Sequence, residues 1–228
     1  MPIEIRNPAA PDQIVATYDE TPDNTLDEVV ARARAAQLEW AALPQPERGV
    51  MVTNFVNALE TRSEEIAKSI TTEMGKPLAE ARGEAMKALG EARASVARAN
   101  APIGEVFGSQ IPGTVSYSTR RPRGVILGIN PWNFPFSTPM RKAIPALVYG
   151  NAIILKPASL TPGAVALMAE VAASTLPENV VQAVIGRGAL GQALAEHRGI
   201  DAVSFTGSVE VGKRVATAAA GHLAEVSL

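Results

Sequence analysis

A short stretch rich in proline and aromatic residues follows the apolar run at 124–129. It reads PWNFP over 131–135, so that two prolines restrict the backbone on either side of Asn133. A loop that only faced water would need no such restriction. The restriction indicates a side chain whose direction is held for a function. The other role open to Asn133 is that of a cap for the next helix.

Further polar residues follow other short apolar runs. Lys156 ends one run, and Gly207 and Ser208 separate another run from a helical segment. A helix N-terminus offers free N–H groups and partial positive charge to a phosphate. A lysine at the same edge could contact a ribose or a phosphate. The simpler alternatives are an ordinary helix cap for Ser208 and, for Lys156, a buried stem with its ammonium group in water.

A glycine-rich turn occurs at 186–191, where GRGALG matches the pattern G-x-G-x-x-G. That pattern is typical of a dinucleotide-binding turn between a strand and a helix. The acidic residue that completes the fingerprint is missing, because Phe205 and Thr206 end the next apolar run. The match alone is equally compatible with a tight turn that binds nothing.

These residues are positioned by an alternation of strands and helices. Short β-branched runs at 124–129, 151–155, 180–185 and 201–205 are each followed by a segment of helical spacing, at 138–149, 161–174, 188–197 and 208–220. The alternation predicts an α/β fold, a parallel sheet with helices on both faces. Ligands of such sheets bind at the carboxyl ends of the strands, where the polar and glycine-rich residues collect.

The first hundred residues have helical periodicity. A capping-box pattern at 25–28 opens the first helix, Pro46 the second and Pro77 a long alanine-rich one that reaches about residue 99, while Gly75 ends the third. We therefore expect a helical region over 1–100.

A glycine- and proline-rich connector at 101–113 precedes a segment, 114–122, that alternates like a strand with one wet face. We expect 101–122 to form a connector with a projecting strand that leaves an exposed edge, and 123–228 to form the α/β domain on which the helical region packs.

Composition excludes several classes of protein. The 228 residues include 21 Lys and Arg against 23 Asp and Glu, and they show no basic stripe with interleaved aromatic residues, so we expect no nucleic-acid partner. The N-terminus does not resemble a secretory signal, and no apolar run approaches the roughly 20 residues of a membrane span. The absence of cysteine excludes disulfides, thiolate metal sites and a cysteine nucleophile. We expect a soluble, cytoplasmic protein without a metal site or a membrane partner.

Four motifs in this order and spacing, PWNFP, ILKPAS, GRGALGQALAEH and FTGSVEVG, resemble the NAD(P)-dependent aldehyde dehydrogenases, as does EMGKP at 73–77. The resemblance implies a five-stranded, Rossmann-like sheet whose glycine turn is used differently from the standard fingerprint. It also implies that Asn133 is the oxyanion-hole asparagine, which donates to the substrate oxygen as a thiohemiacetal forms. We expect the two prolines and two packed aromatic rings to hold it rigid.

The resemblance further implies a cofactor site. It places Lys156 at the adenosine ribose, with Ser208 and Trp132 near the pyrophosphate, while Gly186 and Gly191 allow the backbone to approach. The full expected set is Ile129, Asn130, Pro131, Trp132, Lys156, Ala158, Ser159, Gly186, Gly191, Phe205, Thr206, Gly207 and Ser208.

Two residues bear on specificity. NAD-preferring members of the family often carry glutamate where this chain has Ser159, and a neutral serine removes the repulsion of a 2′-phosphate. The expected cofactor is therefore NADP or NAD, with NADP favoured. Arg141 matches a position in the substrate tunnel where semialdehyde dehydrogenases, such as the succinate semialdehyde enzyme, bind a distal carboxylate with arginine. Its alternative is a surface arginine beside Lys142.

The family's cysteine nucleophile and its general-base glutamate lie in a later catalytic domain. The chain resembles the N-terminal half of such an enzyme, so we expect aldehyde oxidation for the family but no activity from this chain alone. We expect a homo-oligomer for a complete enzyme. The alternatives are a non-catalytic nucleotide-binding module and an unrelated doubly wound binder of nucleotides or sugar phosphates.

Overall fold

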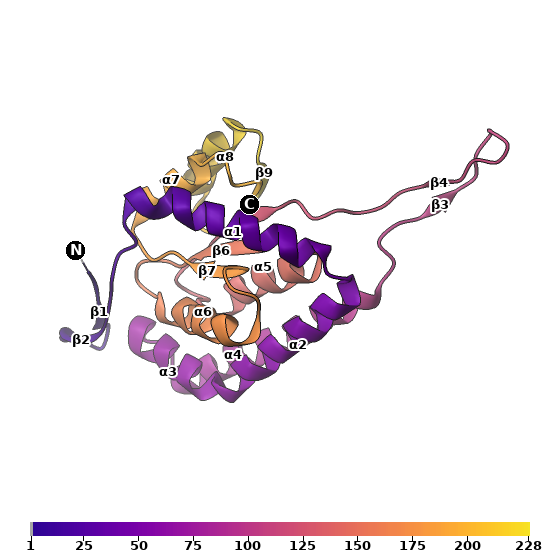
Figure 1. Ribbon diagram of the computed structural model, residues 1–228. Coiled ribbons are helices and arrows are strands. Elements are labelled where there is room, and N and C mark those ends of the chain that lie inside the picture. The colour runs from indigo at the N-terminus through magenta and orange to yellow at the C-terminus, as the bar shows by residue number, and fades with distance from the viewer. Residues whose placement is uncertain (1) are drawn as a thin grey trace.

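The computed structural model describes residues 2–228 and has an α/β architecture (Figure 1). The strands are β1 (Ile3–Asn7), β2 (Ala10–Tyr18), β3 (Val106–Phe107), β4 (Ser116–Tyr117), β5 (Val125–Ile129), β6 (Ala152–Lys156), β7 (Val181–Ala183), β8 (Ala202–Phe205) and β9 (Glu225–Ser227). The helices are η1 (Asp23–Thr25), α1 (Leu26–Ala42), α2 (Gln45–Thr61), α3 (Ser63–Met74), α4 (Leu78–Val96), η2 (Ala97–Asn100), α5 (Ser137–Val148), α6 (Gly163–Thr175), α7 (Gly188–Glu196) and α8 (Val209–Ala220).

A five-stranded parallel sheet in the order β7–β6–β5–β8–β9 forms the centre of the molecule. β5 pairs with β6 from Val125↔Ala152 to Ile129↔Lys156 and with β8 on its other side. The predicted parallel α/β sheet is thus confirmed, including the four strand–helix units. β9 adds a fifth strand that the sequence pattern did not predict.

Helices cover both faces of the sheet, as β6 illustrates, because all its residues are buried. Ile153 and Leu155 pack into a core formed with α2, α3, α4, α5 and α6. Ile154 points the other way, into a core formed with α1, α7 and α8. This alternation follows from the two-residue period of a strand, and burial on both faces explains why the strand is apolar throughout.

The four predicted N-terminal helices are present. Gly75 adopts a left-handed conformation, with φ of +78°, and ends α3 as glycine commonly does. The predicted capping box at 25–28 is wrong, because the Thr25 hydroxyl donates to the carbonyl of Pro22 at 2.7 Å and closes the turn of η1 instead. None of the helices within residues 2–228 is long and apolar enough to cross a membrane.

The expected helical region 1–100 begins with an antiparallel hairpin, β1–β2, that was not predicted. Its signal in the sequence is short, since only Ile3 and Ile5 are buried on β1 and most of β2 is exposed. A hydrogen bond to a residue distant in the sequence connects the hairpin to α3. The Tyr18 hydroxyl donates to the Glu73 carboxylate at 2.8 Å.

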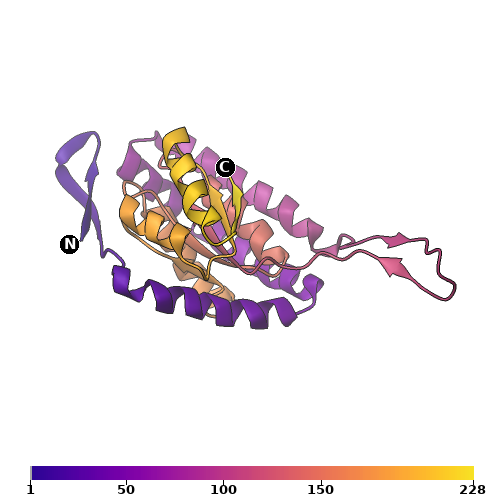
Figure 2. The same cartoon turned by 90° about the horizontal axis from the view of Figure 1, so that it is seen from above.

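A long arm leaves the opposite end of the molecule and carries β3 and β4 (Figure 2). The segment 114–122 therefore projects, but only Ser116 and Tyr117 form a strand, and they pair with β3 within the arm. The apolar side chains of Val106, Val115 and Tyr117 are exposed along it.

Candidate functional site

The carboxyl ends of β5, β6 and β8 border a cavity of about 600 Å³. Its lining comes from the segments that follow these strands and from α7 and α8. The lining residues are Ile129, Asn130, Pro131, Trp132, Asn133, Lys156, Ala158, Ser159, Leu160, Gly188, Gly191, Gln192, Phe205, Thr206, Gly207, Ser208, Val211 and Val215. The structure thus brings together Asn133 and every residue expected at the cofactor except Gly186.

The loop at 131–135 holds Asn133 in a way that the sequence did not predict. Trp132 and Phe134 are 53% and 49% exposed, so the expectation that packed rings rigidify the loop was wrong for this chain. The Nζ of Lys76 instead donates to the carbonyl of Asn133 at 2.9 Å. Asn133 also does not cap α5, whose N-cap residue is Phe136.

Asn130 lies at the end of β5 and is buried. Its Nδ2 donates to the carbonyl of Gly128 at 2.9 Å, whereas its Oδ1 has no hydrogen-bond partner among the described residues. A buried acceptor without a partner is costly. The oxygen itself is inaccessible to solvent, so other atoms of Asn130 line the cavity.

Lys156 ends β6 and is buried, so its ammonium group does not extend into water as the simpler alternative proposed. The Nζ donates to the carbonyls of Pro157 at 2.9 Å and Gly186 at 2.8 Å. Burial lowers the pKa of Lys156 to about 8, against an opposing effect of the Glu20 carboxylate. Its stem packs on Gly191, where an added Cβ would lie 3.1 Å from the lysine Cδ.

The glycine turn divides into two parts. Gly186 is not among the residues that line the cavity, and a Cβ there would come within 2.2 Å of Leu190, so this glycine permits close packing of the turn on α7. Gly188 and Gly191 face the cavity. A Cβ at Gly188 would have no atom within 4 Å apart from its chain neighbours and the backbone of its own helix.

The N-terminus of α8 forms another side of the cavity. Ser208 is its N-cap residue, and its Oγ accepts from the backbone N–H of Val211 at 3.4 Å. Gly207 lets the ring of Phe205 fold close, since an added Cβ would lie 2.6 Å from that ring. The cavity lining contains no acidic side chain among the described residues. A helix N-terminus, a lysine and no carboxylate favour an anionic ligand.

Arg141 does not line this cavity. It lies on α5, where its guanidinium donates two hydrogen bonds to Glu91 on α4, at 2.6 and 2.9 Å. The hydrogen bonds to Glu91 raise the pKa of Arg141 above its ordinary value.

The partly buried position of Lys142 was missed, since an Arg-Lys pair looks like solvated surface, but Lys142 does not line the cavity. Its Nζ donates to the carbonyls of Ile129 and Ser204, at the ends of β5 and β8. Burial lowers the pKa of Lys142 to about 7. Gln192, Leu160 and Val211 were also missed, because only their place on the cavity wall marks them.

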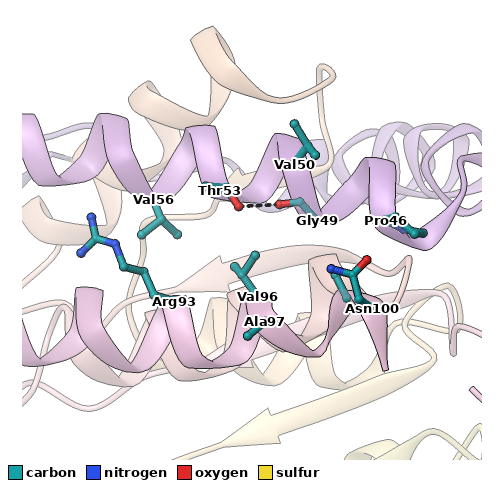
Figure 3. A pocket seen from close by; sticks show the side chains of 10 residues that line it. Pro46, Gly49, Val50, Thr53, Val56, Arg93, Val96, Ala97 and Asn100 are labelled. Atoms are coloured by element: carbon teal, nitrogen blue, oxygen red, sulfur yellow. Dashed lines mark hydrogen bonds between the residues drawn. The ribbon is translucent and has the colours of Figure 1, made fainter. Parts of the chain in front are cut away.

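A second hollow, of about 430 Å³, lies between α2 and α4 (Figure 3). The hydroxyl of Thr53 is already bonded to the carbonyl of Gly49 at 2.8 Å, and the guanidinium of Arg93 pairs with Glu60. This hollow therefore offers less polar chemistry than the cavity at the sheet edge. Residues 2–228 contain no group of three or more His, Cys, Asp or Glu side chains able to hold a metal ion.

A family model described as aldehyde dehydrogenase family matches residues 1–228. The chain belongs to the aldehyde dehydrogenase family. It is 37% identical to an alpha-ketoglutaric semialdehyde dehydrogenase of Bacillus subtilis over 99% of this chain and 47% of that protein. It is 35% identical to N-succinylglutamate 5-semialdehyde dehydrogenase 1 of Caulobacter vibrioides, over 89% of this chain and 43% of that protein.

Solved aldehyde dehydrogenases share the fold. The lactaldehyde dehydrogenase of Escherichia coli matches with a TM-score of 0.95 and 32% identity, over 99% of this chain and 48% of that one. A 3,6-anhydro-L-galactose dehydrogenase solved in complex with NAP matches with a TM-score of 0.93 and 30% identity, over 99% and 48% of the two chains. The chain spans about half the length of the curated relatives it matches.

Proposed function

We propose that the cavity binds NADP or NAD, and that the chain supplies the cofactor-binding half of an enzyme that oxidises an aldehyde to the acid. The observation that carries this proposal is the cavity lining, which combines the N-terminus of α8 and the buried Lys156 with no acidic side chain among the described residues. These groups fit a nucleotide that bears phosphates and hydroxyl groups. When bound, the nicotinamide would supply the hydride acceptor.

Asn133 has a separate role in this proposal. Its amide would donate a hydrogen bond to the aldehyde oxygen as negative charge develops there. Such a donor lowers the barrier only if its direction is set before the reaction, because reorientation would cost part of the gain. Its position on the wall of the cavity supports this role.

We further propose that NADP is favoured over NAD. Ser159 lines the cavity, and its neutral side chain adds no negative charge that would repel a 2′-phosphate. One similar structure was solved with NAP, whereas another, PnpE, was solved with nicotinamide adenine dinucleotide.

For the substrate, we propose an aldehyde that carries a carboxylate. Alpha-ketoglutaric and N-succinylglutamate semialdehyde dehydrogenases are among the similar proteins. Arg141 would grip the carboxylate with its guanidinium fork. Its present partner is Glu91, so a substrate carboxylate would have to replace or share that ion pair.

The residues of this chain predict that it binds the cofactor but does not oxidise an aldehyde. The chain contains no cysteine, so it lacks the nucleophile expected of the family. Pure chain should bind NADP saturably in a calorimetric titration and produce no NADPH from any aldehyde. Steady NADPH production by the pure chain would contradict the proposal that the catalytic nucleophile comes from residues outside this chain. The alternative, a nucleotide-binding module, would be favoured if this chain bound NADP saturably but a longer chain that contains it oxidised no aldehyde.

In a complete enzyme, the exposed apolar residues of the arm that carries β3 and β4 would form the subunit contact.

A further inference from the structure

The helix after the Asn133 loop is capped by a residue from another helix. The first turn of α5 receives no cap from Phe136, its own N-cap residue. The Oε1 of Glu84, on α4, accepts from the backbone N–H groups of Phe136 and Ser137, both at 3.1 Å. A carboxylate at this end of a helix also interacts favourably with the helix dipole. Glu84 therefore fixes where α5 begins, 53 residues along the chain.

Burial of that carboxylate requires a cation. The Glu84 side chain is 3% exposed, and its Oε2 accepts from the Nζ of Lys76, whose side chain is 11% exposed. A buried charge without a partner is strongly destabilising, so the two residues depend on each other.

The same ammonium group holds the loop. The Nζ of Lys76 donates to the carbonyl of Asn133 at 2.9 Å and lies 4.4 Å from the centroid of the Phe134 ring. The ammonium group of Lys76 thus contacts the Glu84 carboxylate that caps α5, the carbonyl of Asn133 and the ring of Phe134. Cation–π contacts at this distance are attractive.

We propose that Lys76 and Glu84 are positioning residues that set the direction of the Asn133 amide. This inference rests on the proposed function, because it matters only if that amide serves as the oxyanion donor. Neither residue touches reacting atoms. Lys76 holds the peptide that joins Asn133 to Phe134. Glu84 holds both the ammonium group of Lys76 and the first turn of α5. The half-exposed rings of Trp132 and Phe134 cannot supply this order by burial.

Backbone order at Asn133 tests the proposal without cofactor or substrate. The chain would be labelled with ¹⁵N at asparagine, phenylalanine and tryptophan, and order parameters would be measured for wild type, Lys76→Met and the double variant Lys76→Met/Glu84→Gln. The double variant leaves no unpaired buried charge and keeps a side-chain oxygen for the two N–H groups of α5. It therefore separates loss of the loop contact from loss of the fold.

We expect the order parameter of the Phe134 N–H, which shares a peptide unit with the Asn133 carbonyl, to fall from about 0.85 to below about 0.6 in the double variant. The buried Trp40 indole should stay rigid, and the unfolding temperature should stay near that of wild type. Arg82→Met is the matched control, since Arg82 lies on the same helix as Glu84 but pairs with the exposed Glu64. It should leave Asn133 unchanged.

If the peptide at Asn133 stays rigid in a folded double variant, the proposal is overturned. Lys76→Arg keeps a cation at this position, so its order parameters at the loop should remain close to those of wild type if the proposal holds. Failure of the chain to bind NADP would contradict the proposed function and leave this result intact. A rigid Asn133 in a double variant that still binds NADP would contradict only the positioning role.

Discussion

The Nζ of Lys156 donates to the carbonyl of Gly186 at 2.8 Å and so joins the end of β6 to the glycine turn that follows β7. With the bond to Pro157, two of the three N–H donors of the ammonium group are used within the chain. The third remains for a ligand in the cavity that Lys156 lines. One lysine thus shapes the glycine turn and offers positive charge to a nucleotide.

Replacement of this lysine should weaken nucleotide binding. Lys156→Met removes a charged donor, and hydrogen bonds to charged groups contribute about 1.5–3 kcal/mol. We expect the Kd for NADP to rise about tenfold or more in calorimetric titration. Lys87→Met, on the exposed face of α4, should leave the Kd unchanged. Equal affinity of Lys156→Met and wild type would show that Lys156 only supports the turn.

Ser159 should control the choice of cofactor. In Ser159→Glu, a carboxylate placed on the cavity wall would repel a 2′-phosphate and accept from a ribose 2′-hydroxyl. We expect the ratio of NAD to NADP affinity to shift toward NAD by about tenfold, a change of about 1.4 kcal/mol. Ser109→Glu, on the projecting arm, is the control for added charge. A ratio unchanged by Ser159→Glu would show that Ser159 does not contact the ribose.

Glu73 should make stability depend on pH. Burial raises the pKa of Glu73 from 4.5 to about 7, although hydrogen bonds from Tyr18 and the Gly163 N–H oppose the rise. The folded chain therefore binds more protons than the unfolded chain between these values, so this contribution is complete below about pH 4.5 and is lost as the pH rises to about 7. Urea unfolding of wild type and Glu73→Gln should differ increasingly over this range, with wild type losing at most about 3 kcal/mol relative to the variant. A difference independent of pH would contradict the raised pKa.

The sequence predicted those features whose signals are local. Continuous apolar runs identified the four central strands, and proline or glycine marked the ends of the N-terminal helices. Residues at strand ends were expected at one edge because parallel strands share that edge. The β1–β2 hairpin was missed because it depends on a contact between Tyr18 and Glu73 that joins distant segments.

The same limit applies to the site. Glu84 and Lys142 sit among ordinary charged residues of helical segments, and only tertiary contacts bury them beside the loop and the strand ends. The rigidity of the Asn133 loop was expected, but its source was assigned to the two prolines and the two rings, because nothing in the local sequence points to Lys76.

The claim that this cavity is the nucleotide site is tested most directly by filling it. Gly188 lines the cavity and has open space at its Cβ position, so Gly188→Phe would place a ring at the cavity wall. Gly90 on α4 is equally open and lies outside the cavity, so Gly90→Phe is the matched control. In NADP titrations, we predict that wild type and Gly90→Phe bind alike and that Gly188→Phe binds at least about tenfold more weakly, with its unfolding temperature little changed. Unaltered NADP binding by a folded Gly188→Phe variant, or no NADP binding by wild type, would contradict the assignment.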